Sequence, residues 1–310
     1  MSAIGLHDMC RNLVQHLVQD APAIRRAIFP CVFALLLAFA PWATQGPRIL
    51  PGLSALSNSP DPNMPRPIAA LDSVFLEELT WLEIRDALRS GKTTAIIATG
   101  GVEQNGPYLA TGKHNYVLRA VTERIARALG DALIAPIVAF VPQGNIDPPN
   151  GHMRYPGTIS LQTDTFKRLL ADIAASLRVH GFRHIVMIGD SFGNQHGMHE
   201  VAERLSREWG PSGTTIHHIP EYYDNARVTR WLQAQGIHEV DEGLHDNVQY
   251  TAQMMLVDPD TVRMRQRIAR GNFSINGVNL APAEKTIVLG RLLVEHQVSL
   301  TVEAIRRARR

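Results

Sequence analysis

Short apolar runs alternate with amphipathic helical stretches from about Ser73 to the C-terminus, and this alternation constrains the fold more than any other feature. Four of the runs have the length and composition of buried strands: Thr93–Thr99, Ala132–Val141, His184–Ile188 and Thr215–Ile219. Strands that alternate with helices predict an α/β fold, here a three-layer α/β/α arrangement around a mainly parallel sheet.

Helices are expected between these runs. Apolar residues at helical spacing predict helices over Thr80–Ser90, Tyr116–Leu129 and Asn194–Trp209. A further helix is expected to begin at a cap formed by Thr163 and Asp164 and to end at Gly181. Outside the helices, the basic stretch 263–270 is interpreted as a solvated face, and His217 and His218 as a strand pair with one side chain inward and one outward.

The N-terminal segment differs from the rest of the chain. An apolar run of 14 residues, Ala27–Ala40, is shorter than the roughly 20 residues that span a bilayer, and Arg25 and Arg26 precede it. A basic region, a short apolar region and an exit of small residues are typical of a secretory signal, so we expect residues 1–43 to be an export leader to the periplasm. A translation start further downstream would instead give a cytoplasmic protein, and a buried or interfacial helix is the structural alternative.

Residues 44–72 are rich in Pro and Ser and are predicted to be a linker, which leaves residues 73–310 as one catalytic domain. The two cysteines, Cys10 and Cys31, lie in the leader and can build neither a disulfide framework nor a cysteine zinc site. The net charge of +2 gives no reason to expect a nucleic-acid partner, and membrane association is expected only through an uncleaved leader.

Three polar, glycine-rich segments leave predicted strands. They are residues 100–115, 151–158 and 189–195. Ligands of open parallel sheets bind just beyond the carboxyl ends of the strands, so these segments are where we expect a small-molecule site.

These segments carry a resemblance to a known family. Residues 103–107 (EQNGP) resemble the EQHGP signature of the creatininase family, and residues 152–160 (HMRYPGTIS) resemble its HMGFPGTIS segment. Residues 181–194 resemble its GFRRIV strand followed by NGHGGN. The resemblance implies an α/β fold, a homo-oligomer, and divalent metal ions that hydrolyse non-peptide amide bonds of small molecules.

The chain departs from the metal ligands of that family. The family uses a Glu, a His two residues later, an Asp eleven residues after the Glu, and the His of NGHGGN; here these positions hold Glu103, Asn105, His114 and Ser191. A two-metal site therefore cannot be carried across. Glu103, His114 and Asp190 still offer two carboxylates and one imidazole, a set suited to one divalent ion such as Zn, Mn or Fe. Glu103 is accordingly expected to act in catalysis, with metal-activated water as the nucleophile.

Other residues are assigned by the same resemblance. His245 aligns with the His of the family's HAGE segment, which implies proton transfer to the leaving group. The side chains expected to contact the substrate are His152, Asn105, Ser191 and Tyr155.

The predicted function is metal-dependent hydrolysis of a small linear or cyclic amide, and the replaced ligands make creatinine itself a poor candidate. Two alternatives stay open. Residues 189–193 also fit G-x-S-x-G, which would make Ser191 the nucleophile of an esterase with His245 as its base. The chain could also be a binding protein that kept the fold without the chemistry.

Overall fold

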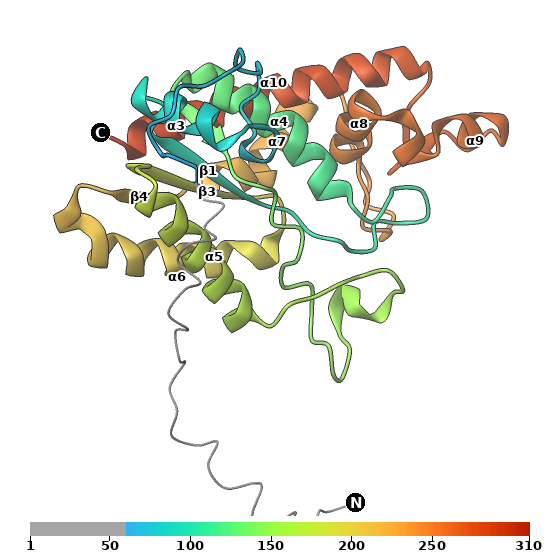
Figure 1. The fold of residues 1–310 in the computed structure, drawn as a ribbon. Helices are drawn as coiled ribbons and strands as arrows, with labels where there is room; N and C mark the ends of the chain where they lie inside the picture. The colour runs from blue at the N-terminus through green and yellow to red at the C-terminus, as the bar shows by residue number, and fades with distance from the viewer. Residues whose placement is uncertain (1–59) are drawn as a thin grey trace, which may run out of the picture. The chain divides into compact units, whose positions relative to one another are not determined.

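A four-stranded parallel sheet forms the centre of the fold (Figure 1). The structure is a computed structural model that describes residues 60–310, so the predicted leader and most of the predicted linker lie outside the described residues. The strands are β1 (Thr94–Thr99), β2 (Ala132–Ile134), β3 (His184–Gly189) and β4 (Thr215–His218), in the order β2–β1–β3–β4 with every pair parallel. The predicted α/β fold with a mainly parallel sheet is confirmed.

Helices surround the sheet. The α-helices are α3 (Trp81–Arg89), α4 (Lys113–Leu129), α5 (Thr163–Val179), α6 (Phe192–Trp209), α7 (Asn225–Ala234), α8 (Val248–Val257), α9 (Met264–Ala269) and α10 (Ala283–Ala308). Short 3₁₀ turns are η2 (Leu76–Glu78), η3 (Gly151–Arg154), η4 (Gly210–Ser212), η5 (Pro220–Tyr223) and η6 (Pro259–Val262). Strands β5 (Ser274–Ile275) and β6 (Val278–Asn279) form a small antiparallel hairpin. Each predicted helix is present.

The two faces of the sheet pack against different helices. Along β1, Ile96 and Ala98 belong to a core cluster with residues of α4, α8 and α10, whereas Ala95 and Ile97 belong to a second cluster with residues of α5 and α6. Figure 1 shows α5 and α6 on one side of the sheet and α4 and α10 on the other. Successive residues of a strand point to opposite faces, so a strand buried on both sides is apolar throughout.

The predicted strand Ala132–Val141 is shorter in the structure. Regular pairing ends at Ile134, and beyond it only isolated bridges occur, at Val138 and Val141. Pro136 lies in this segment and has no N–H to donate to a sheet ladder, which explains the interruption.

Three local expectations are corrected. The N-cap of α5 is Gln162, and no side chain caps that helix, so Thr163 and Asp164 lie in its first turn instead. His217 and His218 are neighbours in β4 and so point to opposite faces, but neither is fully exposed: both are partly buried, and His218 Nε2 lies 3.0 Å from Gln195 Oε1 of α6. Arg267 is only 2% exposed, within the stretch expected to be solvated, because its guanidinium lies over the ring of Tyr108.

The compact unit that contains the sheet extends from Pro65 to Arg310. Its first residues, predicted as linker, contact α3: the Leu71 N–H donates to Glu83 Oε1 at 2.6 Å and Arg66 Nε to Asp86 Oδ2 at 3.1 Å. Within residues 60–310, no helix has both the length and the apolar character needed to cross a membrane.

Candidate active site

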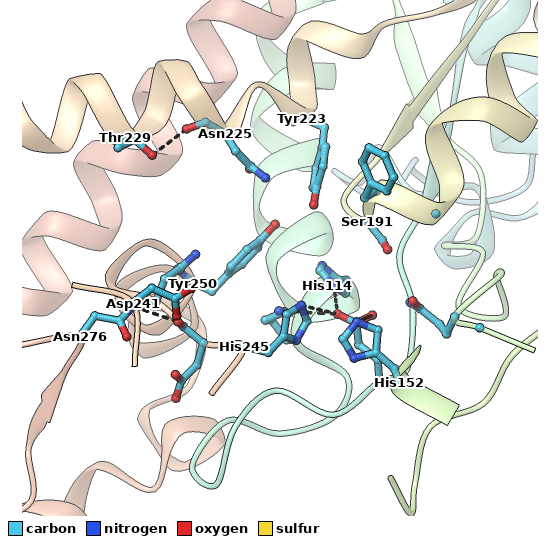
Figure 2. A pocket seen from close by; sticks show the side chains of 18 of the residues that line it. His114, His152, Ser191, Tyr223, Asn225, Thr229, Asp241, His245, Tyr250 and Asn276 are labelled. Atoms are coloured by element: carbon cyan, nitrogen blue, oxygen red, sulfur yellow. Dashed lines mark hydrogen bonds and ion pairs between the residues drawn. The ribbon is translucent and has the colours of Figure 1, made fainter. Parts of the chain in front are cut away.

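A cavity of about 530 Å³ opens at the carboxyl ends of β1 and β3 (Figure 2). Its wall brings together the loop after β1, the start of α4, η3, the start of α6 and the segment before α8. This is the edge of the sheet where the sequence placed the polar segments, and where ligands of parallel sheets bind.

Asparagine side chains fix the loop after β1. Asn194 Nδ2 donates to the carbonyl oxygens of Thr99 and Gly100 at 3.1 and 2.9 Å. The Asn105 side chain is buried and its Nδ2 donates to the carbonyl oxygens of Glu103 and Ala110 at 2.9 and 3.2 Å. Asn105 therefore holds the loop in shape.

His114 lies between two carboxylates. Its Nε2 is 2.7 Å from Glu103 Oε1 and its Nδ1 is 2.9 Å from Asp190 Oδ2, and all three side chains are buried. Tyr250 completes the group, since its ring meets that of His114 edge-on and its hydroxyl lies 3.5 Å from Asp190 Oδ1.

The Lys113 amine is buried beside this group. Its side chain is only 2% exposed, and Nζ lies 3.7 Å from Glu103 Oε1 and 4.4 Å from the centre of the Tyr250 ring. Burial lowers the pKa of Lys113, although the nearby Glu103 and Asp190 oppose that change.

Two further histidines approach Glu103 from the cavity side. His152 Nε2 is 3.7 Å from Glu103 Oε2 and His245 Nε2 is 3.9 Å from Glu103 Oε1. The two rings lie 4.2 Å apart, centre to centre. His245 Nδ1 lies 3.0 Å from the Gln104 carbonyl oxygen, which leaves Nε2 facing Glu103. The backbone of His245 has φ 62°, a left-handed conformation that is rare for a residue with a side chain.

The charge states of two of these groups follow from their surroundings. Burial by itself raises the pKa of Glu103, but the hydrogen bond and charge of His114, with the charges of Lys113 and His152, outweigh it and bring that pKa to about 2. Burial, and then the charge of Lys113, lowers the pKa of His245 against the pull of Glu103. At neutral pH the cavity therefore presents an ionised carboxylate and a neutral imidazole.

Ser191 does not have the geometry of a nucleophile. It lines the cavity, but its backbone is ordinary extended chain, φ −134° and ψ 147°, where a nucleophile elbow is a strained turn. Within residues 60–310, no hydrogen bond joins the Ser191 hydroxyl to a histidine, and both nitrogens of His245 face other groups.

The residues predicted from the sequence are distributed as follows. The cavity is lined by Glu103, His114, His152, Ser191 and His245. Asp190 lies behind His114, while Asn105 and the half-exposed Tyr155 are not part of the cavity wall. Contact of these two with substrate stays a prediction.

The predicted metal ligands Glu103, His114 and Asp190 do meet, and their binding of an ion stays a prediction. Both ring nitrogens of His114 already contact carboxylates, and the ring separates Glu103 from Asp190. Three donor atoms within 4.8 Å of one another, each able to face an ion, come instead from Glu103, His152 and His245.

Sequence reasoning did not single out Lys113 as a site residue. A signal was present, because Lys113 lies four residues before Val117 and continues the buried face of α4 through Val121 and Ile125. A charged residue in line with an apolar stripe indicates a functional position more often than an exposed one does.

Comparisons with known proteins agree with the fold. Residues 77–305 match the Creatininase family, described as creatinine amidohydrolase. A creatinine amidohydrolase from Pseudomonas putida is 27% identical over 195 residues, which cover 61% of this chain and 74% of that protein. Two solved creatininases each align with 76% of this chain and 98% of their own: a manganese form (TM-score 0.57, 24% identity) and a mutant of the Zn-Zn type (TM-score 0.58, 23% identity).

The family match and the curated relative indicate that this chain is a hydrolase. The chain belongs to the creatininase family, a family of metal-dependent hydrolases, because the family match covers most of the described residues.

Proposed function

We propose that this protein is a metal-dependent amidohydrolase that cleaves a C–N amide bond of a small molecule. The observation that carries the proposal is the convergence of Glu103, His152 and His245 on one side of the cavity. Two imidazoles and one carboxylate form a donor set suited to a single Zn, Mn or Fe ion with positions left open for substrate.

The surroundings of these donors support the fit. The Gln104 carbonyl at His245 Nδ1 is the kind of outer contact that orients a ligating histidine. Glu103 is ionised, and metal ligands must be free of protons. An ion bound there would polarise the substrate carbonyl and activate water.

Of the three metal ligands predicted from the sequence, this proposal retains Glu103 as a ligand and gives His114 and Asp190 a supporting role. His114 holds Glu103 Oε1 at 2.7 Å, and Asp190 holds the far side of the ring. The carboxylate is thereby fixed before any ligand arrives, and preorganised ligands bind and catalyse better than mobile ones.

The role of His245 depends on the metal. A histidine that gives Nε2 to an ion cannot use the same atom to protonate a leaving nitrogen, and its Nδ1 faces the Gln104 carbonyl. We therefore propose that His245 is a metal ligand. If His245→Asn binds the metal as the wild type does, the predicted role of His245 in proton transfer is favoured instead.

Small polar groups line the rest of the cavity. Ser191, Tyr223 and Asn225 face it from the side of α6 and α7, and His152 faces it from η3 (Figure 2). A cavity of this volume fits a small molecule, and its polar wall can orient an amide through hydrogen bonds.

The decisive experiment is metal analysis of the purified protein beside Glu103→Ala, with Glu208→Ala as the control because Glu208 is a half-exposed residue of α6. We expect about one divalent ion per chain in the wild type and the control, little in Glu103→Ala, and loss of amide hydrolysis on chelation. Substoichiometric metal in all three proteins contradicts the proposal.

A binding protein without turnover is the second candidate. Asn105, His114 and Ser191 at the family's ligand positions favour it. Binding of amides or lactones to metal-loaded protein with no product formed would support this candidate over the enzyme.

Two further proposals concern the whole chain. We propose that residues 1–43 direct export to the periplasm, which fractionation of cells that express the full chain would test. We also propose a homo-oligomer, which light scattering would test.

A further inference from the structure

Lys113 is a charged side chain enclosed in the active site. It is the first residue of α4, it lines the cavity, and it is 2% exposed. Lysine is almost never fully buried unless it is paired, because removing an ammonium from water is costly. Its partners are the Glu103 carboxylate at 3.7 Å and the face of the Tyr250 ring at 4.4 Å.

The position of Lys113 relative to the candidate metal ligands is specific. Glu103 Oε1 is the atom that Lys113 Nζ, His114 Nε2 and His245 Nε2 all approach, at 3.7, 2.7 and 3.9 Å. Glu103 Oε2 faces His152 instead. Three groups of the chain therefore approach Oε1, and His152 approaches Oε2.

We infer that the Lys113 ammonium is a fixed cation of the active site, so that the cavity holds one divalent ion beside one ammonium rather than two ions. This inference rests on the proposed metal-dependent function. The ammonium lies 3.7 Å from Glu103 Oε1, and a positive charge held there repels a further cation that approaches the same carboxylate. A Zn-Zn creatininase on the same fold achieves two positive centres with two metals.

The contacts of the neighbouring residues support Lys113 as a cation in place of a second metal ion. Asn105, which stands where the family has a metal-binding histidine, has its amide turned to the carbonyls of its own loop. His114 takes the place of the family's aspartate and contacts two carboxylates. In the cavity wall the Lys113 ammonium can donate to the carbonyl oxygen of a substrate, where charge develops during hydrolysis.

The test is Mn²⁺ binding, measured by calorimetry and by metal analysis, in Lys113→Met and Lys113→Arg. Lys285→Met is the matched control, because Lys285 is exposed on α10 and the same charge is removed far from the cavity. We expect one ion in the wild type and in Lys113→Arg. Lys113→Met should bind Mn²⁺ at least tenfold more tightly, because the repulsion is gone, and its kcat at saturating metal should fall at least tenfold.

The outcomes separate the two proposals. Unchanged or weaker Mn²⁺ binding in Lys113→Met overturns the role of Lys113 and leaves the metal site standing. A second ion in the wild type also overturns it. No metal in any of the proteins defeats the proposed function, and the inference with it. If Lys113→Met does not fold, Lys113→Gln is measured in its place, with the same expectations.

Discussion

The Nε2 atom of His114 lies 2.7 Å from Oε1 of Glu103, so a buried ring fixes the carboxylate that faces the cavity. The same ring contacts Asp190 through Nδ1 at 2.9 Å. The group therefore extends from the loop after β1 to the end of β3, and it connects the two neighbouring strands at the edge where ligands bind.

Removing the His114 ring should weaken metal binding without abolishing it. In His114→Ala, Glu103 loses its fixed orientation, and such outer contacts typically contribute 10–100-fold to metal affinity. Calorimetry with Mn²⁺ measures the change, and His196→Ala serves as the control because His196 is exposed on α6. Equal affinity in the two variants contradicts a supporting role for His114.

The serine esterase alternative is tested by Ser191→Ala. Because Ser191 has ordinary backbone geometry and no histidine contact in the described residues, we expect kcat to change less than about tenfold. Loss of a true nucleophile costs many orders of magnitude. Turnover that survives chelation and disappears in Ser191→Ala would instead establish the esterase.

His218 makes stability depend on pH. Burial, and then the charge of His199, lowers the pKa of His218 to about 4, from about 6.5 in the unfolded chain, although Glu221 opposes the shift. The unfolded state therefore binds a proton first, so stability is complete above pH 6.5 and falls as the pH drops toward 4. Urea unfolding of His218→Gln should show a shallower loss over this range, and the exposed His196→Gln should follow the wild type.

Gly290 is the contact point of α10 with α8. A Cβ atom there would lie 2.0 Å from the carbonyl oxygen of Ala252, a backbone atom that cannot move aside. We expect Gly290→Ala to lower the free energy of unfolding by about 1–3 kcal/mol, the usual cost of overpacking. Gly210→Ala is the control, since nothing lies within 4 Å of its Cβ position, and it should be close to neutral.

Arg267 should resist replacement even by lysine. Its guanidinium lies over Tyr108 at 4.2 Å while Nη2 donates to the Ser274 carbonyl at 2.8 Å and Nε to the Asn272 carbonyl at 3.2 Å. Lysine has neither the planar group nor these donors, so we expect Arg267→Lys to cost about 1–3 kcal/mol. Thermal unfolding checks this against Arg265→Lys, which lies on the exposed side of α9. Equal melting temperatures would show that the buried contacts contribute nothing.

The sequence by itself determined the four strands of the sheet and the helices α3 to α6, but it did not predict α7 to α10. Residues such as Ile96 and Ile97 are apolar on both faces of a strand, and this pattern depends only on neighbours along the chain. The sequence also located the loops of the site, because the carboxyl ends of parallel strands meet at one edge of the sheet for any loop sequence.

Only the tertiary structure decided how the site residues pair. The sequence brought Glu103, His114 and Asp190 together as ligands, but the turn of α4 places the His114 ring between the carboxylates, and the left-handed backbone of His245 turns that side chain toward Glu103. The direction of a side chain depends on the rotation of its helix and on loop conformations set by contacts distant in sequence. The inward position of Lys113 was decided in the same way, by the packing of α4 on the sheet.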